Sequence, residues 1–337
     1  MHAIVLRQHG SWQNLTPEDV PIPSPGPGQV RIKVESASVN YADIVRRRND
    51  AYPMPIHLPA VLGGEVAGTI DAIGDGVDPS RWTVGSRVFA VMPSGGIGGY
   101  AQFAVADIAS VIPIAAELDF DIACTLVVAG VTAYQTLKEA GRIEAGDSVF
   151  IPGASGGVGA YAVQLAKLLG AATVIAGAST AEKRAQALRA GADHAVDYTA
   201  KGWADQVKIM TGGRGADIIL EMAGGTFFNE SLAALAPFGR LVVYGTASRE
   251  RSTMVPQALL GPCQTVAGYY VSNWFTARKE ATMRAFETLN DLILSGKLQV
   301  DIGARLPLHM AGEAHRIMEN RQANGKIVLK PWADPVG

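Results

Sequence analysis

A glycine-rich turn is the segment of this chain best suited to chemistry. Residues 153–159 read G-A-S-G-G-V-G; an apolar run at 148–151 that predicts a buried strand precedes them. Residues 160–169 follow, and their apolar spacing predicts a helix. A strand, a tight turn and a helix N-terminus together direct backbone N–H groups at a diphosphate. The residues predicted to line this turn are Ala154, Ser155, Gly156, Gly157, Val158 and Gly159.

Two of these glycines have distinct expected roles. Gly156 lets the backbone approach a ligand, and Gly159 lets the helix pack closely on the strand. Position 154 is Ala, where the dinucleotide-binding pattern usually begins with Gly. The strand before the turn and the helix after it favour nucleotide binding over an ordinary glycine turn.

The end of the next expected strand indicates which dinucleotide is bound. NAD-binding units usually place an acid about twenty residues after the glycines, where it holds the ribose diol. Here that strand ends at 174–179 without an acid, so no carboxylate would repel a 2′-phosphate. Lys183 and Arg184 follow on the next expected helix and can supply positive charge, and Ser179 can add a hydroxyl. We therefore expect NADPH rather than NADH.

The composition excludes several classes of protein. With 48% hydrophobic and 18% charged residues, the 337-residue chain is globular and long enough for about two domains. A formal net charge of -2 provides no basic field for nucleic acid. Two distant cysteines, Cys124 and Cys263, exclude a disulfide framework and favour a reducing cytoplasm. We expect neither a signal peptide nor a membrane span, because no segment has the required apolar pattern.

The pattern of elements predicts two domains of different class. Up to about residue 110, short alternating strands are separated by Gly and Pro turns, which predicts a small β-barrel-like domain. From about 120 to 268, strands and helices alternate, which predicts a doubly wound parallel sheet. The last part of the chain is expected to return to the first domain. The predicted division is 1–122 with 270–337, and 123–269.

Several separate blocks of sequence identify the family that the chain resembles. They include 28–30 (GQV), 39–43 (VNYAD), 63–68, 130–134 (GVTAY), the glycine turn and 324–329 (NGKIVL). Together they resemble the zinc-independent quinone oxidoreductase branch of the medium-chain dehydrogenase/reductase superfamily. The resemblance covers essentially the whole chain. It implies an α/β fold in which a Rossmann domain accompanies a discontinuous GroES-like catalytic domain, with a cleft between them.

The positions that hold catalytic zinc in other members of this superfamily are changed here. Zinc-dependent relatives use a Cys, a His-Glu pair and a second Cys, whereas the matching positions are Asn40, Gly64-Glu65 and Val128. Tetrahedral zinc needs three protein ligands besides water, and Glu65 alone remains. Two cysteines also cannot supply the four thiolates of a structural zinc site. We expect no metal, and we expect Glu65 to be a structural carboxylate rather than a base.

The resemblance also implies roles for individual residues. Asn40 is expected to orient the nicotinamide or a substrate oxygen, Tyr52 to donate a hydrogen bond or proton, and Asp43 to orient its neighbours. Tyr52 is the implied substrate contact. From the residues alone, Tyr269, with Trp274 near it, is a further candidate substrate contact, and packing of these aromatic residues in the core is at least an equally good interpretation. Lys183 and Tyr198 are the implied contacts to the 2′-phosphate. The implied neighbours of the nicotinamide are Thr132 and the loop of Gly245, Thr246 and Ala247. Arg321 and Lys326 are implied to reach the cofactor from the other domain.

The expected activity is hydride transfer from NADPH to a quinone or to the C=C bond of an α,β-unsaturated carbonyl compound. Two alternatives remain open. An enoyl-thioester reductase would need a basic groove, for which Arg46, Arg47 and Arg48 are the candidate, although a solvated helix face is the simpler interpretation. An NADPH-binding protein with little turnover is the other. The apolar segment 253–271 matches the edge that pairs in dimers of the family, so we expect a homodimer.

The predicted phosphate contact can be tested by one substitution. Replacing Lys183 by Ala should raise the KM for NADPH by about tenfold, because a charge-assisted contact to the 2′-phosphate is lost. The KM for NADH should change much less. Steady-state kinetics with both nucleotides measures this, and an equal effect on the two would contradict the assignment.

Overall fold

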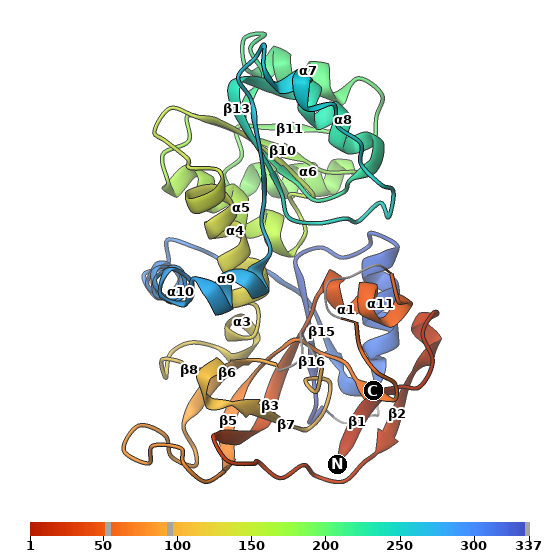
Figure 1. Cartoon of the computed structure of the whole chain (residues 1–337), viewed down its shortest axis with the longest axis vertical. Helices are drawn as coiled ribbons and strands as arrows, with labels where there is room; N and C mark the ends of the chain where they lie inside the picture. Colours follow the sequence, from red (N-terminus) through yellow and green to blue (C-terminus); the bar gives the residue numbers. More distant parts are fainter. Residues whose placement is uncertain (51–54, 93–96, 334–337) are drawn as a thin grey trace. The chain divides into compact units, whose positions relative to one another are not determined.

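The computed structural model describes residues 1–50, 55–92 and 97–333 of the chain. The chain folds into two compact units (Figure 1). Unit 1 comprises Met1–Val127 and Asp301–Gly337, and unit 2 comprises Val128–Val300. The domain ranges predicted from sequence differ from these units over residues 123–127, which belong to unit 1, and over residues 270–300, which belong to unit 2. Tyr52 lies outside the described residues.

Unit 1 is built on two β-sheets. Strands β2 (Leu15–Asp19), β1 (His2–Leu6) and β4 (Ala60–Val61) form a three-stranded antiparallel sheet in that order. The larger sheet has the order β15-β16-β3-β5-β6-β8, and β7 also pairs with β3. Its strands are β3 (Gln29–Val39), β5 (Glu65–Ile73), β6 (Arg87–Val91), β7 (Phe103–Asp107), β8 (Val111–Pro113), β15 (Ile302–Pro307) and β16 (Lys326–Lys330).

The period-two pattern read from the sequence matches the burial along β3. Val30, Ile32 and Val34 are buried, and the residues between them are partly exposed. The C-terminal strand β16 pairs antiparallel with β3, with Ile327 opposite Val39. The expected return of the chain end to the first domain is therefore present within unit 1.

Helix α1 (Tyr41–Arg48) begins directly after β3, with Asn40 as its N-cap, and ends at Asn49 in the left-handed conformation. The expectation that Arg46–Arg48 form a solvated face is wrong, because Arg46 and Arg47 are buried. Arg47 pairs with Glu319 at the end of α11 (Ala311–Glu319), with Nη2 2.6 Å from Oε1, and donates to the Gly10 carbonyl at 2.8 Å. The arginines therefore join α1 to its neighbours. A further short helix of unit 1 is α3 (Phe120–Ala123).

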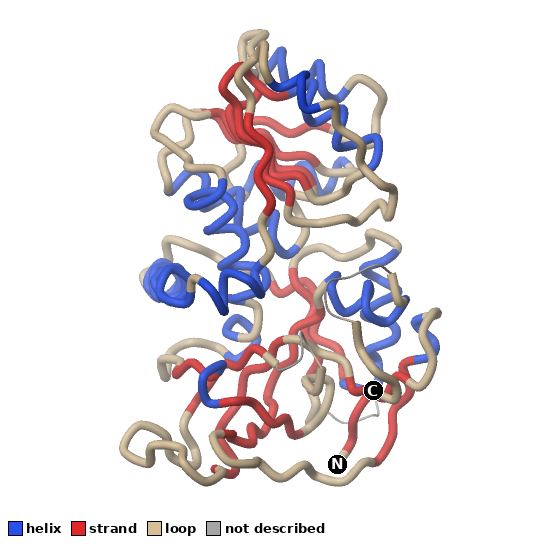
Figure 2. The backbone as a smooth tube through the Cα atoms, in the orientation of Figure 1, coloured by secondary structure: helices blue, strands red, loops and turns tan. Residues whose placement is uncertain are grey.

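Unit 2 contains a six-stranded parallel sheet of order β11-β10-β9-β12-β13-β14, which is the order of a dinucleotide-binding fold. The strands lie side by side with helices on either side (Figure 2). The strands are β9 (Ser148–Pro152), β10 (Thr173–Gly177), β11 (His194–Val196), β12 (Ala216–Glu221), β13 (Leu235–Val243) and β14 (Thr265–Gly268). The helices include α4 (Thr132–Gln135), α5 (Gly157–Leu168), α6 (Ala181–Arg189), α7 (Trp203–Met210), α8 (Gly225–Ala234), α9 (Val271–Ala277) and α10 (Lys279–Leu294).

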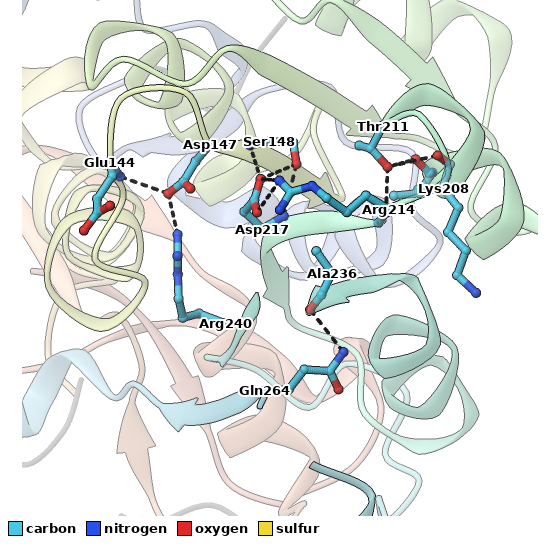
Figure 3. Close-up of polar contacts among 12 residues, drawn as sticks. Glu144, Asp147, Ser148, Lys208, Thr211, Arg214, Asp217, Ala236, Arg240 and Gln264 are labelled. Atoms are coloured by element: carbon cyan, nitrogen blue, oxygen red, sulfur yellow. Dashed lines mark hydrogen bonds and ion pairs between the residues drawn. The ribbon is translucent and has the colours of Figure 1, made fainter. Parts of the chain in front are cut away.

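Hydrogen bonds and ion pairs link the strands at the amino edge of this sheet (Figure 3). Asp217 in β12 accepts hydrogen bonds from the Ser148 backbone N–H at 2.8 Å and from its hydroxyl at 2.7 Å, and pairs with Arg214 at 2.6 Å. Asp147 accepts the Glu144 N–H and pairs with Arg240. These contacts tie β9, β12 and β13 together at one end, so this edge has a structural role.

Replacing Asp217 by Ala should destabilise the protein, since Ser148 loses the acceptor for two donors in a buried position. We expect a loss of about 1–3 kcal/mol, which corresponds to a lower Tm by about 2–4 °C per kcal/mol. Thermal unfolding measures this. The matched control is Lys208→Ala, whose exposed ion pair with Asp205 at 3.9 Å should contribute little. Equal Tm values for the two variants would contradict the prediction.

Candidate active site

The glycine turn lies at the carboxyl edge of the parallel sheet, between β9 and α5. Gly153 adopts the left-handed conformation with φ of 64°, and Gly156 is the extended N-cap of α5. A Cβ on Gly159 would lie 2.2 Å from the Gly153 carbonyl oxygen, so only glycine permits this close approach. The first turn of any helix leaves its N–H groups without intrahelical partners, and that of α5 contains no acidic residue. A diphosphate therefore fits this turn in both geometry and charge.

The Ala at position 154 is compatible with the turn. The left-handed residue is Gly153, and Ala154 is not among the residues with positive φ. The Ala154 N–H donates to the Gly177 carbonyl at 3.0 Å and thereby links the turn to the end of β10. Ala154 and Ser155 are both buried. The departure from the usual pattern at 154 is thus compatible with the turn of residues 153–159, which we name the glycine cradle.

Ser179, Lys183 and Tyr198 follow the carboxyl ends of the adjacent strands β10 and β11. Thr180 caps α6 by accepting the Lys183 N–H at 3.2 Å, which fixes the first turn of that helix. Tyr198 packs edge-on against Phe227, with ring centroids 5.7 Å apart. The predicted 2′-phosphate residues are therefore brought to one edge of the sheet.

An ion pair at this edge was not foreseen from the sequence. Arg184 lies 3.1 Å from the Asp197 carboxylate and donates to the Ala178 carbonyl at 3.0 Å. Hydrogen bonds from the Thr199 hydroxyl and backbone lower the pKa of Asp197, so this acid is ionised. An acidic residue, Asp197, therefore follows β11 although none follows β10, and Arg184 pairs with it. Arg184 lies on α6 and Asp197 follows β11, and no local sequence pattern predicts that these two side chains pair.

Gly245, Thr246 and Ala247 follow β13 and are attached to the segment after β12. The Ala247 N–H donates to the Met222 carbonyl at 2.9 Å, and a Cβ on Gly245 would lie 2.7 Å from the same oxygen. Glu221 is fully buried and accepts the N–H groups of Ala223 and Gly224, each at 2.8 Å. Burial raises the pKa of its carboxyl. Sequence reasoning did not identify Glu221, although an acidic residue at the end of the apolar run of β12 was a signal for it.

Thr132 and Tyr269 also lie in unit 2. Tyr269 is buried, and its hydroxyl donates to the Gln135 side chain at 2.8 Å. Its ring stacks on Trp274, with centroids 5.8 Å apart, as expected for neighbouring aromatic residues. Thr132 begins α4 and is buried as well. The Tyr269 hydroxyl therefore already has a protein acceptor, and its buried, stacked ring is in keeping with the core packing that the sequence left open.

In unit 1, Asn40 stands between two charged side chains. Its Oδ1 accepts a hydrogen bond from Lys326 Nζ at 2.7 Å, and its Nδ2 donates to Glu65 Oε2 at 2.9 Å. Lys326 also donates to the Val39 carbonyl at 3.1 Å. Burial lowers the pKa of Lys326, and the nearby Glu65 carboxylate opposes that effect. Sequence reasoning listed Lys326 as a cofactor contact and did not foresee its bond to Asn40.

Asp43 fixes the backbone at the same place. Its Oδ2 accepts the Asn40 N–H at 2.9 Å and the Tyr100 hydroxyl at 3.0 Å. Asp43 is fully buried, and burial raises the pKa of its carboxyl. Arg321, by contrast, is exposed at the end of α11 with φ of 55°. Asn40, Asp43 and Lys326 are thus brought together, whereas Arg321 lies on the surface.

Family models match most of both units. The model for the zinc-binding dehydrogenase family matches residues 157–288, and that for the alcohol dehydrogenase GroES-like domain matches residues 26–116. A 2-haloacrylate reductase from Burkholderia is 33% identical over 98% of this chain and 99% of its own. The chain belongs to the quinone oxidoreductase branch of the medium-chain dehydrogenase/reductase superfamily.

Two further relatives support this membership. Quinone oxidoreductase 1 of Escherichia coli is 31% identical over 88% of this chain and 89% of its own. A mycobacterial protein solved as a complex with NADPH superposes with a TM-score of 0.90 at 34% identity, covering 98% of this chain and all of that one. The predicted fold, a Rossmann sheet with a GroES-like domain, is confirmed.

The family contains members that bind zinc. Across residues 1–50, 55–92 and 97–333, no group of three or more His, Cys, Asp and Glu side chains is gathered to hold a metal ion. In the same part of the chain, no helix has the length and apolar character to cross a bilayer. In this member of the quinone oxidoreductase branch, Glu65 is hydrogen-bonded to Asn40.

Replacing Gly159 by Ala tests the cradle. The added Cβ must displace the Gly153 carbonyl or α5, so we expect NADPH to bind about tenfold more weakly, a loss of about 1.4 kcal/mol. Fluorescence titration with NADPH measures the Kd. Gly261→Ala is the control, because nothing lies within 4 Å of its added Cβ and its φ is not in the left-handed range. Unchanged NADPH affinity in Gly159→Ala would rule out the close approach as a requirement.

Proposed function

We propose that this protein is an NADPH-dependent oxidoreductase that transfers hydride to quinones or to the C=C bond of α,β-unsaturated carbonyl compounds. The observation that carries the proposal is the carboxyl edge of the unit 2 sheet. There a glycine cradle stands beside Lys183 and Arg184, and no acid ends β10. Relatives solved with NADPH, and the 2-haloacrylate reductase, support the same cofactor and substrate class.

The residues of the chain have distinct tasks in this reaction. The turn 154–159 holds the diphosphate, and Ser179, Lys183 and Tyr198 hold the 2′-phosphate. When bound, NADPH supplies the hydride. Thr132, the loop 245–247, Arg321 and Lys326 were predicted to complete the cofactor contacts, and they stay predictions. Hydride addition to the carbon far from the carbonyl leaves negative charge on oxygen, which needs a hydrogen-bond donor and then a proton.

Asn40 and Tyr52 are the proposed donors at the reacting end, and Tyr269 is a proposed substrate contact. Asn40 carries an amide whose position is set by Lys326, Glu65 and Asp43. Asp43 orients rather than transfers protons, because its buried oxygen already accepts two hydrogen bonds. Tyr52 is retained on its match to the family alone.

The enoyl-thioester alternative depended on a basic groove formed by Arg46, Arg47 and Arg48, and the contacts of these residues do not support such a groove. Arg46 and Arg47 are buried, and Arg48 pairs with Asp50 at 2.6 Å and with Glu319 at 3.2 Å. These arginines therefore do not offer a basic groove for a carrier phosphate. An NADPH-binding protein with little turnover stays as the alternative that an assay must exclude.

The proposed activity is tested by mixing the protein with NADPH and a panel of acceptors. The panel holds 1,4-benzoquinone, a simple enone, 2-chloroacrylate and an enoyl thioester, with a primary alcohol and NADP⁺ as the reverse test. We expect loss of reduced-nicotinamide absorbance with the quinone, the enone or the haloacrylate. Silence on all acceptors, with NADPH bound in a parallel titration, would favour the binding role.

We also propose an isologous homodimer formed through the edge of the unit 2 sheet. The strand order ends at β14, so one side of this strand has no partner in the described sheet. Near it in sequence, Leu260 is 73% exposed and Val255 is 67% exposed. Light scattering measures the mass, and a monomer at micromolar concentration would contradict this. We place the protein in the cytoplasm, in keeping with its two unpaired cysteines.

A further inference from the structure

The two ends of the Asn40 amide are held by groups of opposite charge. Lys326 is 4% exposed and Glu65 is fully buried, so both contacts are made away from water. Lys326 lies at the carbonyl end at 2.7 Å, and Glu65 lies at the amino end at 2.9 Å. We name this arrangement of Asn40, Lys326 and Glu65 the amide clamp.

The clamp permits only one orientation of the amide. A lysine ammonium can only donate hydrogen bonds, and an ionised carboxylate can only accept them. Rotating the Asn40 amide by half a turn would place its NH₂ group against the ammonium and its carbonyl against the carboxylate. Both hydrogen bonds would be lost, and two repulsive contacts would replace them. The charges of Lys326 and Glu65 therefore choose the orientation, which an uncharged pair would choose less strongly.

The sheet builds the clamp from three neighbouring strands. Asn40 directly follows β3, Glu65 opens β5 and Lys326 opens β16, and β3 pairs with both other strands. The Asn40 backbone is fixed separately by Asp43, whose carboxylate accepts the Asn40 N–H. Backbone and side chain of Asn40 are thus held by different residues.

The second amide hydrogen of Asn40 makes only a long hydrogen bond. Asn40 Nδ2 donates to Ser38 Oγ at 3.4 Å, which is weaker than the bond to Glu65 and which a closer acceptor on a ligand can replace. Asn40 as a whole is 7% exposed, so the residue is not completely buried. The ammonium of Lys326 at the carbonyl end polarises the amide and strengthens its N–H donors, since hydrogen bonds in a chain reinforce one another.

We propose that Lys326 and Glu65 are positioning residues that orient the Asn40 amide for the reaction, and that Lys326 also polarises it. This rests on the proposed function, in which Asn40 acts at the reacting end. Lys326 Nζ donates to Asn40 and to the Val39 carbonyl, so two of its three N–H groups are used within unit 1.

A double-mutant cycle tests the proposal. We expect Lys326→Met to lower kcat with an enone by about tenfold or more, because the amide is no longer oriented. In an Asn40→Ala background the same change should alter kcat within about twofold, since no amide is left to orient. The Kd for NADPH should stay within about twofold of the native value. Lys326→Arg, which keeps the charge, should recover part of the lost kcat.

The matched control is Lys330→Met on the same strand. Lys330 bonds to Ser36 and Asp121 instead of Asn40, so its loss should leave kcat within about twofold of native. If Lys326→Met fails to fold, Glu65→Gln is the second variant, and we expect it to lower kcat as well. Additive effects of Asn40→Ala and Lys326→Met, or a large rise in the NADPH Kd with kcat unchanged, would overturn the clamp.

A measurement without cofactor separates this inference from the proposed function. The side-chain amide signals of Asn40 are identified by NMR from their loss in Asn40→Ala, after selective asparagine labelling. In the native protein we expect slow hydrogen exchange and a shifted signal, and in Lys326→Met faster exchange and a signal near that of free asparagine. Identical signals in both proteins overturn the clamp. Silence of the native protein on the acceptor panel rejects the proposed function instead, and with it the catalytic use of the clamp.

Discussion

The antiparallel pairing of β16 with β3 is the contact on which the proposed chemistry of unit 1 depends. It joins residues almost a whole chain length apart, with Lys326 and Asn40 separated by 286 positions. Without this pairing, Asn40 would have no partner for its carbonyl and Lys326 would be a buried cation without its acceptors. Such a cation is costly unless it is paired and hydrogen-bonded. Strand pairing and side-chain electrostatics therefore support each other.

The parallel sheet of unit 2 divides its polar groups between two edges. At the amino edge, Asp217 accepts hydrogen bonds from Ser148 and pairs with Arg214, which stabilises the sheet. At the carboxyl edge, the turn before α5 presents backbone N–H groups and a positive helix end. Gly159 makes that approach possible, because any larger side chain would meet the Gly153 carbonyl. A nucleotide diphosphate is the ligand that this edge is shaped to bind.

Several buried charged side chains of unit 1 are paired or hydrogen-bonded, and they orient their partners. Arg47 holds Glu319, Asp43 holds the Asn40 backbone and the Tyr100 hydroxyl, and Glu65 holds the Asn40 amide. Burial lowers the pKa of His315, beside Tyr100, to about 3, so this residue stays neutral near physiological pH. Fixed orientation is the property that a donor to a developing oxyanion requires.

The sequence by itself determined the fold class, the glycine turn, most strands of both units and the family, because these depend on local periodicity and on contiguous motifs. It also predicted the preference for NADPH from the missing acid after β10. Only the tertiary structure decided that Arg46 and Arg47 are buried, that Arg184 pairs with Asp197, and that Lys326 bonds to Asn40. Each of these depends on which strands and helices become neighbours, and no local pattern encodes a contact between residues that only folding brings together.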